Sequence, residues 1–501
     1  MDTVSARIYS SKNAKGKFVF PEQQYYGIHT DDVAMAMSGG GSRAFTMSMA
    51  AVRFLERIGL MSEVSYTSTV SGSNWFIAPY TFRELNLGGY RDSETITLEM
   101  LESNNIGFAG DVCINTPIFD KLKEGKNFHI PHDKLWQYVV GKCFLEPYGL
   151  NSKSMVMNQK RAKHYMENNL TETEVPIEGR PFWISNAAVE CNKGCSNLTS
   201  TPAYAGISSR VSANDDIVGG VLIETPCFDS RNPCIEIKPG KQNVDLELIR
   251  SFTINDIIGA SSAAFSYIVE QLDDKIMKYI KIKSGEFETL NPKFNFWDSQ
   301  GENNTELVTT DGYRVDNLGI VSLLSRRCKK ILCMCANLEI ESSLLNTNLY
   351  PLFGIWNENG GSADITDGSQ VFYKEDWIHV KNYIEDKMRI GGPVYLHKRL
   401  RVKPNKRLSV EGNYEVELLI FFLYPSVNYI SLLNPEIQAQ MNTGENTGSL
   451  NNFPNYKTVF QNKKQIAGYT RIQVNLLHYY VQWCLKTCKH LIVNFFHSEI
   501  V

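Results

Sequence analysis

Neither sign of charge is in excess in this sequence: 51 Lys and Arg residues stand against 54 Asp and Glu residues, a net charge of -3. Proteins that bind nucleic acid by neutralising its phosphates usually carry a clear basic excess. The charge balance therefore predicts no nucleic-acid partner.

Long hydrophobic runs are also absent. The longest one, Leu418 to Tyr424, is far shorter than the roughly 20 apolar residues that cross a bilayer. The first residues, Met1 to Arg7, are polar and do not resemble the apolar segment of a secretion signal. We therefore expect a cytoplasmic protein without a transmembrane segment.

Cysteine is present but forms no metal-binding pattern. The chain has 11 cysteines, an odd number spread over its length. Two pairs, Cys191 with Cys195 and Cys484 with Cys488, have a spacing that suits a zinc site, but neither has a matching second pair. A structural zinc normally takes four ligands. We expect reduced thiols and no metal.

No internal repeat or low-complexity tract divides the chain. Length alone is a soft guide to the number of domains. We predict that residues 1–30 form a polar arm and that residues 31–501 form a single domain. Insertion or cap segments are expected around residues 80–300, where polar stretches interrupt the apolar ones.

The first unit that suggests chemistry is a glycine-rich loop between a strand and a helix. Val33 to Met37 is a short apolar run typical of a buried strand, and apolar residues from Arg43 to Leu60 recur at helical spacing. Consecutive glycine N–H groups at a helix N-terminus can bind a phosphate or an oxyanion. The loop, Ser38 to Ser42, lacks the spacing of the nucleotide-binding motifs. A tight turn explains its glycines equally well.

A second strand, turn and helix follow at once. Residues 64–70 are rich in β-formers, and a helix can begin at Asn74. Ser71 lies on the sharp turn between them, as in a nucleophile elbow, although a helix-capping serine is the simpler interpretation. Ser261 is a competing nucleophile, but it lies among small residues that indicate close helix packing.

The rest of the chain alternates between helices and strands. Strands are predicted at residues 182–186, 221–223 and 331–334, and helices at residues 254–272 and 320–324. This alternation is typical of an α/β sheet.

A loop from Asp311 to Gly319 offers a carboxylate for the serine. Asp311 could take the proton of Ser71, or it could form an Asx turn. None of the nine histidines lies in a setting typical of a catalytic triad. A carboxylate can act as the only base if partial desolvation raises its pKa. A Ser-Asp dyad is therefore chemically reasonable.

Three motifs together resemble the cytosolic phospholipase A2 and patatin-like family. They are SGGGSRA at residues 38–44, VSGSNW at residues 70–75, and Asp311-Gly312 followed by Asn317-Leu318. Gly41 precedes Ser71 by 30 residues, and Asn317 follows Asp311 by six, as the family pattern expects. The likeness covers residues 30–490 thinly and these motifs strongly.

The resemblance implies a three-layer α/β catalytic fold with a central, mostly parallel sheet and helical-loop insertions. It assigns Ser71 as nucleophile and Asp311, rather than Asp316, as base. It places the oxyanion hole at Gly40 and Gly41. It also assigns Arg43 to the substrate phosphate or to support of the loop.

The function that the resemblance implies is hydrolysis of acyl esters in phospholipids or lysophospholipids, without a cofactor. No segment resembles the calcium-binding module of calcium-recruited members, so we expect no calcium requirement. Two residues depart from the family pattern: Thr69 replaces a glycine before the elbow, and Tyr313 occupies the third position of the aspartate motif. An acyltransferase with the same dyad and an inactive lipid-binding member remain alternatives.

Lipid cleavage implies transient contact with a membrane surface. Arg399, Arg401 and Lys403 alternate with Leu400 and Val402, so a strand here would have a basic face able to contact anionic lipid. The simpler interpretation is a solvated strand of a hairpin whose partner is residues 416–423.

Overall fold

The computed structural model describes most of the chain. The described residues are 3–30, 32–88, 95–103, 106–168, 170, 172–264, 284–301, 304–341, 344–355, 367–441, 450–456 and 468–498. None of the helices in these ranges is both long enough and apolar enough to cross a membrane.

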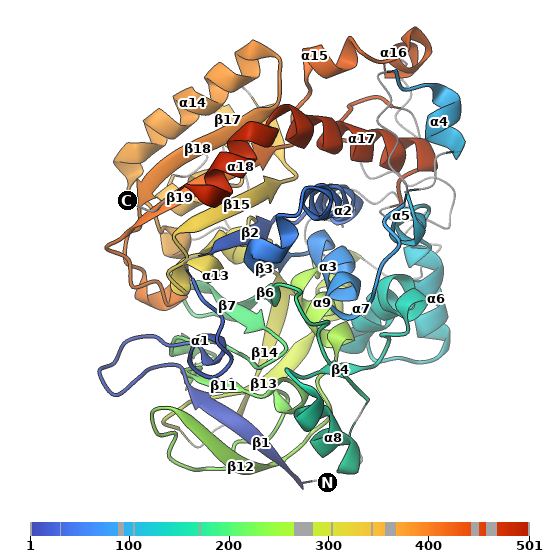
Figure 1. Ribbon diagram of the computed structural model, residues 1–501. Helices are drawn as coiled ribbons and strands as arrows, with labels where there is room; N and C mark the ends of the chain where they lie inside the picture. The colour runs from blue at the N-terminus through green and yellow to red at the C-terminus, as the bar shows by residue number, and fades with distance from the viewer. Residues whose placement is uncertain are drawn as a thin grey trace.

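Thirteen strands of the described chain form one large sheet (Figure 1). Its five central strands are parallel and lie in the order β6, β3, β2, β15, β19. Because they are parallel, they all end at one side of the sheet, which we call the carboxyl edge. Their bounds are Phe182–Cys191 for β6, Val64–Val70 for β3, Val33–Met37 for β2, Lys330–Cys335 for β15 and Glu415–Phe422 for β19.

Antiparallel strands flank the parallel core on both sides. Beyond β19 the sheet ends with β18, and beyond β6 the order is β7, β8, β11, β1, β12. In addition, β14 pairs with β6, and β13 pairs with β14. The bounds are Val394–Arg401 (β18), Gly194–Ser200 (β7), Ala205–Gly206 (β8), Val221–Ile223 (β11), Thr3–Ser10 (β1), Lys241–Glu247 (β12), Asn304–Asp311 (β14) and Lys293–Trp297 (β13).

Helices cover both faces of the sheet, which gives the three layers that the motifs predicted (Figure 1). On one face, Met35 and Met37 of β2 share a hydrophobic core with α2 and α17. On the other face, Ala34 and Ala36 share a core with α13 and α14. Successive strand residues point to opposite faces, and both faces of β2 are covered, which explains why all five of its residues are apolar. The helices are α2 (Gly41–Arg57), α17 (Arg471–Thr487), α13 (Ile320–Ser325) and α14 (Trp377–Ile390).

Several helices lie between residues 80 and 180, where we expected insertion or cap segments. They are α4 (Leu98–Ser103), α5 (Phe108–Cys113), α6 (Ile118–Asn127), α7 (His132–Val140) and α8 (Gln159–Glu167). Other described α-helices are α1 (Pro21–Tyr25), α3 (Gly72–Phe82), α9 (Ile254–Ser261), α12 (Tyr313–Asp316), α15 (Val427–Ile430), α16 (Pro435–Met441) and α18 (Lys489–His497). Short strand pairs outside the sheet are β4 (Ser154–Met155) with β5 (Thr173–Glu174), β9 (Val211–Ala213) with β10 (Asp216–Val218), and β16 (Leu338–Glu341) with β17 (Leu344–Thr347).

The N-terminal segment, which we expected to be a polar arm, contributes to the fold. Its strand β1 pairs with both β11 and β12. The sequence signal for this strand was the alternation of apolar and polar residues. Val4, Ala6 and Ile8 are buried and alternate with polar residues, as in a strand with one covered face. In α1, Glu22 forms a fully buried ion pair with Arg326, with 2.5 Å between Oε1 and Nε. The division of the chain into an arm and one domain stays a prediction.

Most predicted elements are confirmed, with one exception at α9. The strands at residues 33–37, 64–70 and 221–223 have the bounds that the sequence indicated. The helix predicted over residues 254–272 ends at Ser261. Just beyond this end, the Ala263 carbonyl accepts a hydrogen bond from the Asp311 N–H, 3.3 Å away. Residues 265–272 lie outside the described residues.

Candidate active site

The register of β6 brings two predicted site residues together. Strand β3 runs parallel to β6 and ends with Val70 opposite Asn186. Strand β14 runs antiparallel to β6 and ends with Asp311 opposite the next residue, Ala187. The two strands therefore approach each other end to end along β6. Ser71, which follows β3, meets Asp311 at that point.

The turn at Ser71 has the sharp geometry that the sequence predicted. Ser71 has φ 52° and ψ −124°, a conformation that a non-glycine residue rarely adopts, and α3 begins at the next residue. Gly72 allows the glycine loop to approach: a Cβ at this position would lie 2.2 Å from the carbonyl oxygen of Gly41. The glycine loop and the serine turn are thus in backbone contact.

Thr69, which departs from the family pattern, is accommodated by hydrogen bonds. Its hydroxyl donates to Asn74 Oδ1 over 2.5 Å and accepts from Trp183 Nε1 over 2.8 Å. The side chain is completely buried at the end of β3. The threonine therefore ties the strand before Ser71 to the helix after it.

Asp311 is a buried carboxyl group in contact with Ser71. It is 2% exposed, and its Oδ1 accepts the N–H of Tyr313 over 2.9 Å. Burial raises its pKa to about 7, and hydrogen bonds from the Tyr313 N–H and the Ser71 hydroxyl act in the opposite direction. A carboxyl group with this pKa exchanges a proton near neutral pH. Tyr313, the other departure from the family pattern, contributes through its backbone here.

Asp316, the alternative base, caps a helix. Its carboxylate accepts the N–H of Leu318 over 2.9 Å and that of Val321 over 2.7 Å. Burial raises its pKa to about 6, while these and neighbouring backbone N–H groups lower it. The carboxylate therefore satisfies the first turn of α13, where helices have unpaired N–H groups.

The glycine loop lies directly beside the serine turn. Gly40 and Gly41 have φ values of 138° and 56°, which favour glycine, and they begin α2. A Cβ at Gly39 would lie 3.0 Å from the Cβ of Ser71. The positive end of the α2 dipole is therefore close to the Ser71 hydroxyl.

Two serines connect the elbow to the glycine loop. Ser73, in the first turn of α3, donates its hydroxyl hydrogen to the carbonyl oxygen of Ser38 over 2.5 Å. Ser48 of α2 in turn donates to the Ser73 hydroxyl over 3.1 Å. These contacts fix the distance between the two turns.

Arg43 lies in the first turn of α2. Its Nη2 donates to Asn337 Oδ1. Among the residues that the structure describes, its buried Nε has no hydrogen-bond partner. The guanidinium lies close to Gly40, since a Cβ at that glycine would be 3.8 Å from Nε. The position suits an anion-binding or loop-supporting role.

Two residues organise this site in ways that the sequence did not reveal: Asn186 was not singled out, and Ser261 was considered only as a competing nucleophile. Asn186 of β6 donates from Nδ2 to the carbonyl oxygen of Thr69 over 3.0 Å, just before the elbow. Ser261 accepts the N–H of Ser71 over 3.0 Å. Asn186 could have been found from the sequence, because an asparagine stands out inside an apolar strand. The contact of Ser261 could not, because the pattern around it indicated only a helix.

The basic strand lies away from the carboxyl edge. The predicted hairpin is confirmed: β18 pairs antiparallel with β19, with Val394 opposite Phe422 and Arg401 opposite Glu415. Arg401 thus lies beside the start of β19, at the opposite side of the sheet from Ser71. Leu400 is buried while Arg399 and Arg401 are exposed, which confirms the predicted alternation. Lys403 donates to Gln370 Oε1 over 2.8 Å.

The described part of the chain contains no group of three or more His, Cys, Asp or Glu side chains arranged to hold a metal ion. Cys191 and Cys195 lie on the two strands of the β6–β7 hairpin. Cys484 and Cys488 lie one turn apart at the end of α17, and both are buried free thiols.

Comparison with known proteins yields structural likeness only. No protein-family model and no curated protein matches the chain. A structure of human GIVD cytosolic phospholipase A2 matches with 12% sequence identity and a TM-score of 0.50, over 94% of this chain and 63% of that one. A second structure of the human protein, in complex with methyl gamma-linolenyl fluorophosphonate and terbium chloride, matches with 14% identity and a TM-score of 0.47, over 94% and 60%.

This chain therefore spans less than two thirds of the length of the human protein. The first likeness confirms the predicted fold class, in which helices flank a large central sheet with parallel core strands. In its fold, the chain is similar to cytosolic phospholipase A2.

Proposed function

We propose that this chain is a serine acyl hydrolase that cleaves acyl esters of phospholipids or lysophospholipids. The observation that carries the proposal is the end-to-end meeting of β3 and β14 on β6, because it sets the Ser71 hydroxyl against the buried Asp311 carboxyl. The motif resemblance supplies the substrate class. The fold likeness is consistent with it.

In the first step, Asp311 accepts the proton of Ser71 while Oγ attacks the ester carbonyl carbon. The N–H groups of Gly40 and Gly41 bind the oxyanion, and the dipole of α2 favours its negative charge. The tetrahedral intermediate collapses, and the lysolipid alcohol leaves with the proton from Asp311. Ser71 then carries the acyl group as an ester.

In the second step, water replaces the alcohol. Asp311 accepts a proton from the water molecule as its oxygen attacks the acyl carbonyl carbon. The same Gly40 and Gly41 N–H groups bind the second oxyanion. Collapse releases the fatty acid, and the proton on Asp311 returns to Ser71. The cycle uses no cofactor.

We assign Arg43 to the phosphate of the substrate. Its unpaired Nε supports this role, since a buried guanidinium N–H gains a charge-assisted hydrogen bond when a phosphate oxygen reaches it. The bond from Nη2 to Asn337 holds the side chain beside the glycine loop. Arg43→Gln should therefore raise KM for a phospholipid more than KM for a nitrophenyl ester.

Because its proposed substrates are membrane lipids, we propose that the protein works from the cytoplasm and associates peripherally with a membrane surface. Contact of Arg399, Arg401 and Lys403 with anionic lipid is a separate part of this proposal. These residues lie at the far side of the sheet from Ser71. Their lipid contact would not by itself bring substrate to the serine.

A fluorophosphonate probe followed by peptide mapping tests the assignment. We expect one labelled peptide, containing Ser71, and no labelling or ester hydrolysis in Ser71→Ala. Ser62→Ala, which removes an exposed serine hydroxyl of the same chain, should behave as wild type. Labelling at a different serine would overturn the mechanism. Lipid binding without any labelling would instead indicate an inactive lipid-binding member.

Product analysis separates hydrolysis from acyl transfer. Incubation of a phospholipid with the protein should release free fatty acid. If an added alcohol or lysolipid received most of the acyl groups, the chain would be an acyltransferase that uses the same dyad.

A further inference from the structure

Ser261 is the last residue of α9 and is completely buried. Its Oγ accepts the N–H of Ser71 over 3.0 Å and the side-chain amide of Asn74 over 2.8 Å. The same hydroxyl donates its hydrogen to the carbonyl oxygen of Asn186 over 2.5 Å. A hydroxyl has one donor and two acceptor positions, so all three are used. Ser261 is thus committed to structure and not available as a nucleophile.

The backbone of this same segment holds the base. The carbonyl oxygen of Ser261 accepts the N–H of Gly312 over 3.3 Å. Two residues later, the carbonyl oxygen of Ala263 accepts the N–H of Asp311 over 3.3 Å and the Thr310 hydroxyl over 3.2 Å. One short segment therefore contacts Ser71 through a side chain and Asp311 through the main chain.

The contact to Ser71 matters because of the strained turn. With φ at 52°, Ser71 is held in a strained conformation that persists only when its surroundings stabilise it. The buried N–H of Ser71 also needs an acceptor. The Ser261 hydroxyl supplies that acceptor and opposes relaxation of the turn.

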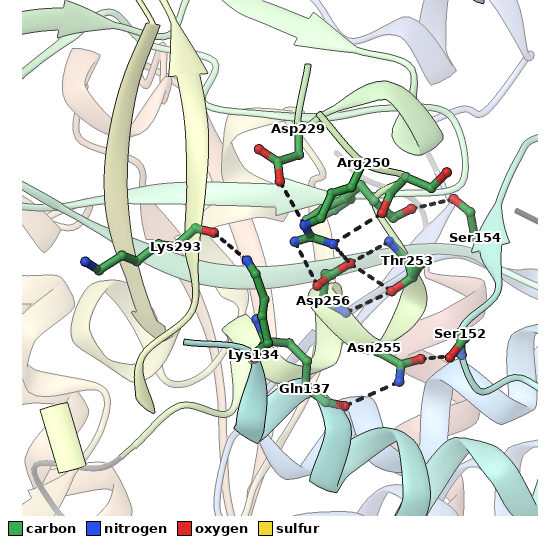
Figure 2. Close-up of polar contacts among 12 residues, drawn as sticks. Lys134, Gln137, Ser152, Ser154, Asp229, Arg250, Thr253, Asn255, Asp256 and Lys293 are labelled. Atoms are coloured by element: carbon green, nitrogen blue, oxygen red, sulfur yellow. Dashed lines mark hydrogen bonds and ion pairs between the residues drawn. The ribbon is translucent and has the colours of Figure 1, made fainter. Parts of the chain in front are cut away.

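The position of Ser261 is set from the other end of α9. Figure 2 shows Arg250 between Asp229 and Asp256, with ion-pair distances of 3.0 Å from Nε and 2.7 Å from Nη1. Asp256 in turn accepts the N–H of Thr253 over 2.8 Å and completes a capping box at the start of the helix. Asn255 accepts the N–H of Ser152 over 2.8 Å. These contacts hold the N-terminal end of α9 in place, and Ser261 lies at its C-terminal end.

We propose that Ser261 is a positioning residue that holds the Ser71 turn in register with the Asp311 loop. This inference rests on the proposed function of Ser71. Removal of the hydroxyl should let the turn relax, so Oγ leaves its line of attack while the substrate still binds. Displacements on the order of 1 Å can cost about 100-fold in rate.

Two neighbouring alanine variants test the proposal. Ser261→Ala removes the contact to the turn. Ser262→Ala is the matched control: Ser262 is also buried, but its hydroxyl donates to the Ile258 carbonyl over 2.6 Å and accepts from Trp136 Nε1 over 3.2 Å. Ser261→Cys keeps the shape with a weaker acceptor. All assays use the full chain, a soluble nitrophenyl ester and a temperature at which circular dichroism shows each variant folded.

We expect kcat and the fluorophosphonate labelling rate to fall about 10- to 100-fold in Ser261→Ala, by loss of alignment. KM should stay within about twofold of wild type, since the substrate-binding groups are intact. The pH midpoint of the rate should stay near 7, because Asp311 remains buried. Ser261→Cys should be intermediate, and Ser262→Ala should resemble wild type.

Three outcomes would overturn the inference: a wild-type rate in Ser261→Ala, an equal loss in Ser262→Ala, or a loss confined to KM. Failure of the proposed function has a different signature. In that case the wild type would either not be labelled or be labelled no faster than Ser71→Ala, whatever happened at Ser261.

Discussion

Val70 and Asp311 are the last residues of two strands that approach each other head to head along β6, pairing with the consecutive residues Asn186 and Ala187. Two strands that pair with the same side of a third strand cannot extend past the point where they meet. Here β3 and β14 both end at that point on β6, and the candidate active site lies there. The residue after Val70 is Ser71, so the strand register brings its hydroxyl into contact with the Asp311 carboxyl group.

The rate of Ser71 labelling should rise with pH through a midpoint near 7. Asp311 must be ionised to accept the serine proton, and burial raises its pKa to about 7, so the base is formed as the pH increases through that value. Labelling rates between pH 5 and pH 9 measure this directly. A rate that did not change over this range would exclude Asp311 as the base.

Asp311→Asn should abolish hydrolysis and yet stabilise the fold at pH 8. In the unfolded chain the carboxyl ionises near its usual pKa, 3.8, whereas the folded chain resists ionisation until about pH 7. Burial of this group therefore costs stability increasingly between pH 4 and pH 7. Removing the charge should add on the order of 2–4 kcal/mol to the free energy of unfolding at pH 8.

The gain in Asp311→Asn should shrink as the pH is lowered toward 4, because the unfolded chain then also begins to bind the proton and the difference between the two states narrows. Urea denaturation at pH 4, 6 and 8 checks this trend. A gain that did not depend on pH would show that the raised pKa is not its cause.

Gly72→Ala should separate the elbow from the glycine loop. The new Cβ would lie 2.2 Å from the backbone oxygen of Gly41, and a backbone atom cannot move aside as a flexible side chain can. We expect a loss of about 1–3 kcal/mol in stability from overpacking and at least a tenfold slower labelling of Ser71.

The matched control for this substitution is Gly392→Ala. Within the described part of the chain, a Cβ at Gly392 would have Asn428 Nδ2 as its one neighbour within 4 Å, at 3.9 Å. Thermal unfolding and labelling should both be close to wild type. Equal labelling rates in the two alanine variants would show that contact between the two loops is unimportant.

Neutralising Arg399 and Arg401 should weaken binding to anionic vesicles without changing hydrolysis of a soluble ester. Each basic residue contributes about 1 kcal/mol at an anionic surface, so the double variant with Gln should bind about 30-fold more weakly. Hydrolysis should persist because both residues lie at the opposite side of the sheet from Ser71.

Arg389→Gln is the control for vesicle binding, since Arg389 is exposed at the end of α14 and paired with Asp386. Vesicle sedimentation at several anionic lipid fractions provides the measurement. If binding did not depend on the fraction of anionic lipid, the prediction would be wrong and the basic strand would be an ordinary solvated surface.

Much of the candidate site could be predicted from the sequence because it depends on short stretches of neighbouring residues. The apolar run before the glycines and the β-rich run before Ser71 are short-range patterns, and both strands have the predicted bounds. A glycine is needed after Ser71 because a larger residue would clash with the backbone of Gly41, and the VSGSNW motif includes this glycine. The choice of Asp311 over Asp316 came from motif spacing, and the two aspartates have different contacts in the structure.

Other features were hidden because they depend on contacts between distant segments. Ser261 lies 190 residues from Ser71 in the chain, and its helical neighbourhood gave no sign of the contact. Glu22 and Arg326 form a buried ion pair although 304 residues separate them in the chain, so the polar composition of the N-terminal segment did not reveal this contact. The pairing of β1 with β11 and β12 has the same origin.

The sequence by itself determined which residues carry the candidate chemistry, since the elbow, the glycine loop and the aspartate motif are local and each needs particular residue types. Only the tertiary structure decided how they meet. The register of β6 places Ser71 against Asp311. Burial, a property of the whole fold, raises the pKa of that carboxyl group to about 7. Antiparallel pairing places the basic residues of β18 at the opposite side of the sheet.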